Sequence, residues 1–131
     1  MAENQLISIV VPMYNEEGNI RPLYDALVRE FDELWYDFEL IFVDDGSRDA
    51  SVANVKRLHE EDSRVKLISL SRNFGHQVAL TAGLEAARGA AVIMMDADLQ
   101  QPPSMLPGMI ARWKEGYDIV YTVREDTEGA G

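Results

Sequence analysis

The sequence has no cysteine and no long apolar run, and both absences exclude classes of protein. Without cysteine among its 131 residues, neither a disulfide framework nor a thiolate metal site can form, so any metal must be held by oxygen or histidine. No apolar run approaches the ~18 residues of a membrane-spanning helix, and residues 1–5 lack the basic and apolar pattern of a secretory signal. We therefore expect a cytoplasmic chain.

Basic residues are also scarce. Twelve Lys and Arg against 23 Asp and Glu give a formal net charge of -11 at pH 7, which argues against nucleic acid and anionic lipid as direct partners. An anionic ligand would need a metal cation or backbone amides to bind. The length and the hydrophobic fraction of 47% are typical of one globular domain or a large piece of one, and a homo-oligomer is compatible with them.

Apolar, β-branched runs alternate along the chain with segments of helical period, which is the pattern of βαβ units. This pattern predicts an α/β fold with a mostly parallel sheet of about five strands and helices on both faces. The expected strands are residues 6–11, 38–43, 65–70, 91–95 and 118–123.

The segments between these strands carry helix start and stop signals. Asn19 is a suitable N-cap for the first helix, and Asp49 for the second. The third helix is expected to run from about His76 to Arg88 and to end at Gly89 as a left-handed C-cap. The fourth should begin near residue 103, end at residue 116 and bury four side chains: Met105, Met109, Ile110 and Trp113.

Four polar loops each follow one of the first four strands, at residues 14–16, 44–47, 71–75 and 96–100. Open α/β sheets bind ligands outside the carboxyl ends of their strands, near the point where the strand order reverses. The sequence therefore predicts one composite site, with Tyr14, Asp44 and Asp96 lining the same pocket.

Two acids, Asp96 and Asp98, are separated by the small Ala97 at the end of an extended run. Because alternate residues of a strand point to the same side, both carboxylates should converge on one spot. Such a pair suits a hard divalent cation that bridges to phosphate oxygens. The alternative is a turn followed by a helix N-cap.

The loop Asp44-Asp45-Gly46-Ser47 also has two interpretations. Asp, Gly and Ser are turn formers, so the segment could be a tight turn without further function. A carboxylate at a strand end can instead accept the N–H of a nucleobase, while the second acid orients the loop.

The remaining candidates are open in the same way. Tyr14 could lie on a base or ribose, and Asn15 could bind the nucleotide or cap the loop before the first helix. Arg72 offers a fork of donors to a diphosphate or forms a surface ion pair. His76, at the start of a helix, is expected to be a structural hydrogen-bond donor.

Taken in order, these motifs resemble those of glycosyltransferase family 2. The resemblance rests on residues 9–17 (IVVPMYNEE), 43–47 (VDDGS) and 96–100 (DADLQ) and covers nearly the whole chain. Residues 71–77 (SRNFGHQ), 79–83 and 101–103 look more like bacterial undecaprenyl-phosphate (bactoprenol) sugar transferases. Dolichol-phosphate mannose synthases are a more distant likeness.

The resemblance implies an inverting enzyme with a Rossmann-like GT-A fold, in which residues 1–124 form the nucleotide-sugar-binding domain and residues 125–131 a flexible tail. The donor would be a nucleoside-diphosphate sugar, with a UDP-sugar preferred to a GDP-sugar. The cofactor would be Mg²⁺ or Mn²⁺, and the acceptor would be a polyprenyl phosphate. The implied donor-binding residues are Pro12, Tyr14, Asn15, Glu16, one of Asp44 and Asp45 for the base, Arg72, Asp96 near the ribose, Gln100 beside the sugar, and Arg124. The implied catalytic and metal-binding residues are Asp96 and Asp98.

This chain departs from the family pattern at Gln101, where an acid is common, and at Thr127, where a basic residue is common. Family members continue with an acceptor-binding half and, in this subgroup, transmembrane helices. We therefore expect a parent protein at the cytoplasmic face of the inner membrane and, for this chain alone, donor binding without transfer. A non-catalytic nucleotide-binding module is the alternative. A phosphoacceptor receiver domain is disfavoured. Such a domain has its acid pair after the first strand and a lysine after the fifth, whereas in this chain the acid pair follows the second strand and Arg124 follows the fifth.

Overall fold

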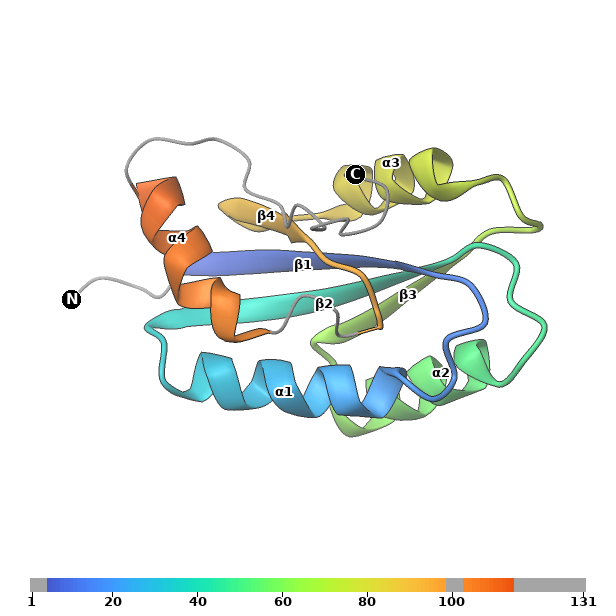
Figure 1. Ribbon diagram of the computed structural model, residues 1–131, viewed down its shortest axis with the longest axis horizontal. Helices are drawn as coiled ribbons and strands as arrows, with labels where there is room; N and C mark the ends of the chain where they lie inside the picture. Colours follow the sequence, from blue (N-terminus) through green and yellow to red (C-terminus); the bar gives the residue numbers. More distant parts are fainter. Residues whose placement is uncertain (1–4, 99–102, 115–131) are drawn as a thin grey trace, which may run out of the picture.

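A four-stranded parallel sheet forms the centre of the fold in the computed structural model, which describes residues 5–98 and 103–114. The strands are β1 (Gln5–Met13), β2 (Tyr36–Asp44), β3 (Val65–Ser69) and β4 (Ala91–Met94), in the order β3-β2-β1-β4 (Figure 1). All four occur where the sequence predicts them. The fifth predicted strand, residues 118–123, and the predicted tail lie outside the described residues.

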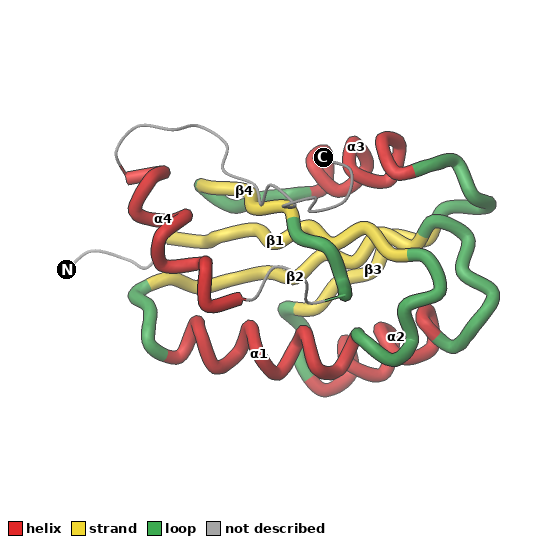
Figure 2. The backbone as a smooth tube through the Cα atoms, viewed as in Figure 1, coloured by secondary structure: helices red, strands yellow, loops and turns green. Residues whose placement is uncertain are grey.

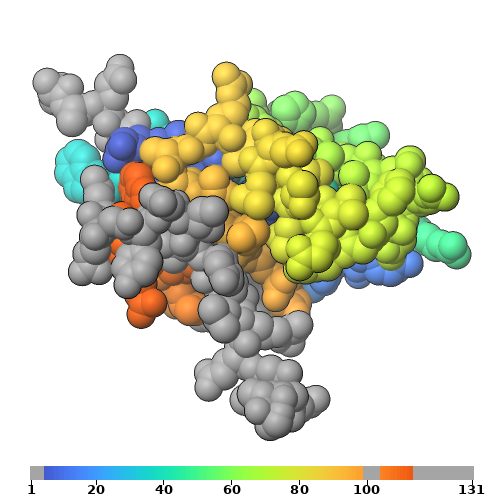
Figure 3. All heavy atoms as spheres, turned by 90° about the horizontal axis from the view of Figure 1, so that it is seen from above, coloured from blue at the N-terminus to red at the C-terminus, as the bar shows by residue number. Residues whose placement is uncertain are grey.

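Helices cover both faces of this sheet, as predicted. The helices α1 (Ile20–Asp32) and α2 (Ser51–Glu61) lie on one face and α3 (His76–Ala86) on the other (Figures 1 and 2). A short 3₁₀ helix, η1 (Pro103–Met105), leads into α4 (Leu106–Lys114), which packs on the α1 side. Figure 3 looks onto the α3 face, where α3, in yellow, lies beside the gold region of β4.

The central strands are apolar on both sides because each side has a helical cover. Ile7, Ile9 and Val11 of β1 are fully buried in the larger core with the apolar faces of α1 and α2, whereas Val10 points into a smaller core under α3. Strands buried on both faces have nearly continuous apolar sequences, and β1 and β2 are of this kind. The site is therefore built on a pair of strands that is buried from residue 7 to 13 and from residue 38 to 44.

Two helix boundaries correct the sequence predictions. The α3 helix ends at Ala86, and the predicted left-handed C-cap at Gly89 is wrong, because the cap residue is Ala87 in an extended conformation. Gly89 is required for space instead: a Cβ there would lie 2.7 Å from both the Leu6 carbonyl oxygen and the Ser8 nitrogen. Asp49 precedes the N-cap position of α2 by one residue, although its Oδ1 still accepts the Ser51 N–H at 2.9 Å.

The fourth helix differs from its prediction at its start. Met109 and Ile110 are buried and Trp113 is partly buried, as predicted, but Met105 is 41% exposed and Leu106 is fully buried in its place. The reason is the 3₁₀ turn at residues 103–105, since three residues per turn shift the apolar face relative to an α-helix. The predicted end at residue 116 lies outside the described residues.

A buried carboxylate in the first half of β2, Glu39, fastens the strands of the sheet to one another. Glu39 is 2% exposed and accepts hydrogen bonds from Ser8 Oγ (2.5 Å), Lys66 Nζ (2.7 Å) and the Arg88 N–H (2.7 Å). Burial opposes ionisation, but the three donors outweigh it and hold the pKa of Glu39 below its ordinary value. This network ties β1, β2, β3 and the α3–β4 connection together.

Candidate functional site

The strand order places the candidate site at a topological switch point. β1 pairs with β2 on one side and with β4 on the other, so the chain reverses its direction across the sheet between β3 and β4. In open parallel sheets, the connections leave in opposite directions at such a point and open a crevice at the carboxyl edge. The loops after β1 and β4 flank this crevice.

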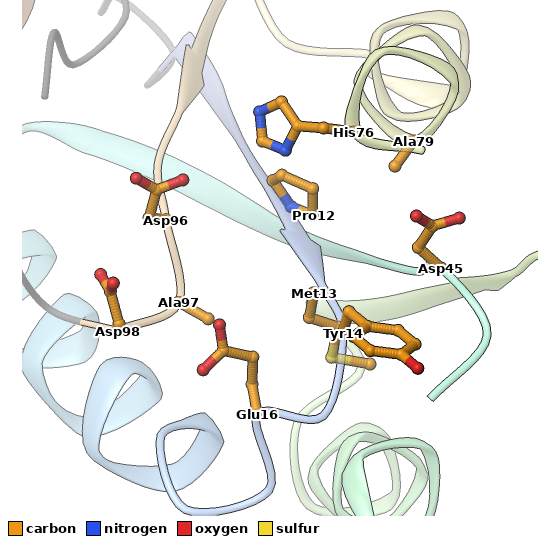
Figure 4. A pocket seen from close by; sticks show the side chains of 10 residues that line it. All are labelled: Pro12, Met13, Tyr14, Glu16, Asp45, His76, Ala79, Asp96, Ala97 and Asp98. Carbon is orange, nitrogen blue, oxygen red and sulfur yellow. The ribbon is translucent and has the colours of Figure 1, made fainter. Parts of the chain in front are cut away.

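A pocket occupies this crevice, and we call it the Asp96 pocket (Figure 4). Its lining comes mainly from the ends of β1 and β4, with one residue after β2 and two from α3. The lining residues are Pro12, Met13, Tyr14, Glu16, Asp45, His76, Ala79, Asp96, Ala97 and Asp98.

Asp96 and Asp98 present their carboxylates on the same side of the chain after β4, whereas Ala97 points to the other side (Figure 4). Ala97 is 1% exposed and belongs to the larger core, which anchors the backbone between the two acids. The strand itself ends at Met94, and Ala97 and Asp98 lie in a turn, so the two acids reach the pocket through a turn and not through the extended segment that the sequence predicts. The pair thus faces the crevice on a rigid support.

The two carboxylates of this pocket suit a hard cation whose other ligands come from phosphate oxygens and water. Within the part of the chain that the structure describes, no three His, Cys, Asp or Glu side chains come together as a metal site. Mg²⁺ and similar ions are commonly held by only one or two carboxylates, with phosphate oxygens and water completing the shell. Two carboxylates beside a pocket fit that mode of binding.

A second pocket, the Asp44 pocket, lies beside the first and shares Tyr14 with it. It is lined by the loops after β2 and β3 together with the first turn of α2: Tyr14, Asp44, Gly46, Ser47, Arg48, Val52, Ser69, Leu70, Ser71, Arg72 and Asn73. Tyr14 and Asp96 thus share a pocket as predicted, but Asp44 does not line it, so the prediction of a single pocket for all three is corrected to two pockets that share Tyr14. Tyr14, which is 43% exposed, separates a pocket containing Asp44 from one containing Asp96.

Asp44 and Asp45 have different surroundings. Asp44 Oδ2 accepts the N–H groups of Gly46 (3.2 Å) and Ser47 (3.0 Å), whereas its Oδ1 is buried without a partner among the described residues. Both oxygens of Asp45 accept backbone N–H groups from the loop before α3. An unpartnered buried carboxylate oxygen is costly unless a ligand or water supplies a donor.

Asn15 joins two loops and does not point into either pocket. Its φ of +53° lies in the left-handed region that Asn tolerates. The Asn15 N–H donates to Ser47 Oγ and its Oδ1 accepts the Arg48 N–H, both at 2.8 Å. Asn15 therefore shapes the site through the loop.

Glu16 lines the Asp96 pocket, and its Oε1 accepts a hydrogen bond from Asn19 Nδ2 at 2.8 Å.

Basic side chains flank the two pockets. Arg72 lines the Asp44 pocket, with its Cζ 5.1 Å from the centre of the Phe74 ring, and Arg48 lines the same pocket. His76 lines the Asp96 pocket (Figure 4). The sequence prediction omitted Arg48 and His76 from the site, although both adjoin loops that it singled out. Gln100 and Arg124 lie outside the described residues.

No helix within residues 5–98 and 103–114 is both long and apolar enough to cross a bilayer. This finding concerns those residues alone.

Comparison with known proteins identifies the family of this fold. The profile "Glycosyl transferase family 2" matches residues 8–131. The chain is 47% identical over 129 residues to "Uncharacterized glycosyltransferase YkcC" of Bacillus subtilis, covering 98% of this chain and 40% of that protein. It is 44% identical over 126 residues to "Prophage bactoprenol glucosyl transferase homolog" of Escherichia coli, covering 95% of this chain and 41% of the relative. The chain thus spans about 40% of the length of these relatives.

Solved structures with nucleotide sugars have the same fold. The mannosyltransferase PcManGT from Pyrobaculum calidifontis, in complex with GDP-Man and Mn²⁺, superposes with a TM-score of 0.67 at 27% identity, over 82% of this chain and 32% of that one. S. aureus TarS 1–349 in complex with UDP-GlcNAc superposes with a TM-score of 0.66 at 26% identity, over 83% and 31% of the two chains.

Proposed function

Because the chain belongs to glycosyltransferase family 2, we propose that it binds a nucleoside-diphosphate sugar across its two pockets and serves as the donor-binding part of an inverting glycosyltransferase. The observation that carries this proposal is the pair Asp96 and Asp98 on one side of the chain, in a pocket at the switch point between β1 and β4. Solved relatives that bind GDP-Man or UDP-GlcNAc share this fold.

The base is assigned to the Asp44 pocket. Asp44 Oδ1 is the buried acceptor without a partner among the described residues, so it can accept the N–H of a uracil or guanine. Asp45 is less suited to this task, because both of its oxygens already accept backbone N–H groups. Tyr14 lies between the pockets and offers a ring face to the base or the ribose. We favour a UDP-sugar over a GDP-sugar.

The diphosphate and the sugar are assigned to the Asp96 pocket and its rim. Asp98, assisted by Asp96, would hold Mg²⁺ or Mn²⁺ against the diphosphate, and Pro12 and Glu16 would border the nucleotide. When bound, the cation would neutralise charge on the departing nucleoside diphosphate. From the adjoining Asp44 pocket, Arg72 would add a forked donor to the diphosphate, which is valuable in a chain of net charge -11. Gln100 and Arg124 complete the proposed set.

The acceptor of the whole protein is proposed to be a polyprenyl phosphate. A bacterial relative named for bactoprenol glucosyl transfer supports this choice. An acceptor phosphate oxygen is already ionised near neutral pH, so it can form the bond to the anomeric carbon as the bond to the nucleoside diphosphate breaks, without a strong general base. We also propose that the whole protein works at the cytoplasmic face of the membrane.

Photolabelling tests the division between the pockets. We expect a UDP-glucose analogue with an azide on the uracil ring to label peptides from residues 44–48 or 69–73 upon irradiation, and excess UDP to prevent it. The corresponding guanine analogue is the comparison for base preference. Labelling confined to residues 96–98, or labelling that UDP does not reduce, would contradict the assignment of the base to Asp44.

A further inference from the structure

Two loops at the carboxyl edge, residues 45–50 after β2 and residues 70–75 after β3, are packed backbone against backbone. A Cβ on Gly46 would lie 2.8 Å from the Asn73 nitrogen and 3.0 Å from the Arg72 carbonyl carbon, and the φ of Gly46 is +86°. Glycine is therefore required at this position both for space and for backbone conformation. The position of the loop before α3 therefore depends on its backbone contact with the loop after β2.

Asp45 fastens the two loops together with its whole carboxylate. Its Oδ1 accepts the Phe74 N–H at 2.7 Å and its Oδ2 accepts the Gly75 N–H at 3.0 Å. Asp45 is only 7% exposed. Charged acceptors make stronger hydrogen bonds than neutral ones, and the first turn of α3, beginning at His76, adds a favourable dipole.

The fastened segment carries one pocket residue on each side. Arg72 comes before it, lines the Asp44 pocket and lies over the ring of Phe74, whose N–H is one of the two bound by Asp45. His76 comes after it and lines the Asp96 pocket. A carboxylate on another loop thus holds the segment whose Phe74 ring contacts the Arg72 guanidinium.

We propose that Asp45 is a positioning residue for donor binding: it holds Phe74 and Gly75 so that Arg72 faces the nucleotide, and it makes no essential contact with the base itself. The proposal rests on the proposed function, in that the ligand is a nucleoside diphosphate. It separates the tasks of two adjacent acids, one for the ligand and one for the loop.

Hydrogen exchange of the ligand-free chain tests the hold on the loop. In Asp45→Asn the neutral amide can replace only one of the two charged acceptors, so we expect the Phe74 and Gly75 amides to exchange at least about tenfold faster. Asp45→Ala should show the same change more strongly. The matched control is Asp49→Asn, which removes a comparable carboxylate from the Glu17 and Ser51 amides and should leave Phe74 and Gly75 unchanged. Unchanged exchange in both Asp45 variants would overturn the proposal.

A double-mutant cycle on nucleotide affinity then tests whether Asp45 acts through Arg72. We expect Asp45→Asn to weaken UDP binding about tenfold in the wild-type background and less than threefold in Arg72→Ala. Equal losses in both backgrounds would mean that Asp45 contacts the ligand or supports the fold in general, and would overturn this inference alone. A folded wild-type chain that binds neither UDP nor GDP would instead overturn the proposed function beneath it.

Discussion

Asp44 and Asp45 are adjacent in sequence, yet their carboxylates serve different loops. Asp44 Oδ2 accepts the Gly46 and Ser47 amides of its own turn and leaves Oδ1 without a partner among the described residues, while Asp45 reaches across to Phe74 and Gly75. Because the open acceptor belongs to Asp44 alone, the two residues should respond differently to the same substitution.

The first prediction concerns Asp44→Asn and nucleotide affinity. The amide oxygen of the variant can still accept the Gly46 and Ser47 N–H groups of the turn. Its NH₂ group then replaces Oδ1, the acceptor that we assign to the base. A hydrogen bond to a charged group contributes about 1.5–3 kcal/mol, so we expect UDP affinity to fall about 10- to 150-fold by calorimetric titration.

The matched control is Asp25→Asn, a substitution of an exposed acid on α1. It should leave UDP affinity unchanged. If Asp44→Asn bound UDP as tightly as the wild type while remaining folded, the base would have to lie elsewhere.

A second prediction follows from the packing of α3 on β1. A Cβ on Gly83 would lie 2.3 Å from Val10 Cγ1, whereas a Cβ on Gly108 of α4 would meet nothing within 4 Å. Overpacking of a core typically costs about 1–3 kcal/mol, so Gly83→Ala should lower the free energy of unfolding by that amount. Gly108→Ala should raise it by up to about 1 kcal/mol, because alanine favours the helical state. Urea denaturation of both variants decides this, and equal effects would contradict the close contact between α3 and β1.

The third prediction concerns acid stability and Glu39. Its pKa is lowered from the ordinary value of 4.5, so its contribution to stability is complete above that pH and is lost as the pH falls through the lower folded value. We expect Glu39→Gln to reduce the free energy of unfolding at pH 7 by about 1–3 kcal/mol. We also expect the stability of the variant to change less than that of the wild type below pH 4.5.

Glu61→Gln is the control for that experiment, since it breaks an exposed ion pair with Arg21 that has little effect in water. Parallel pH profiles for wild type and Glu39→Gln would rule out the buried network as a source of acid sensitivity.

Strand positions and the edge that carries the site could be predicted because both follow from periodicity and from parallel connection. Short, continuous apolar runs such as residues 6–11 are typical of strands in a sheet that is covered on both faces. Parallel strands bring the loops that follow them to one edge of the sheet. Asp96 and Asp98 line the site because they follow β4 directly at this edge, although a turn at residues 97–98 takes the place of the predicted extended segment.

Other features depend on contacts between distant segments, which a single sequence does not reveal. The need for Gly89 comes from the backbone of Leu6 and Ser8, and the exposure of Met105 from a 3₁₀ turn. Which of Asp44 and Asp45 keeps an open oxygen depends on the loop before α3, whose amides occupy Asp45. The sequence therefore left this choice open.

Titration of the purified chain with UDP and GDP, with and without Mn²⁺, tests the central claim most directly when the Asp98→Asn variant is included. A carboxylate pair that binds a cation against a diphosphate should make nucleotide affinity depend on the metal. We predict at least about tenfold tighter binding with Mn²⁺ for the wild type, and no gain with Mn²⁺ for Asp98→Asn at unchanged thermal stability. Equal affinity of the wild type with and without Mn²⁺, or a full gain retained in Asp98→Asn, would contradict the account.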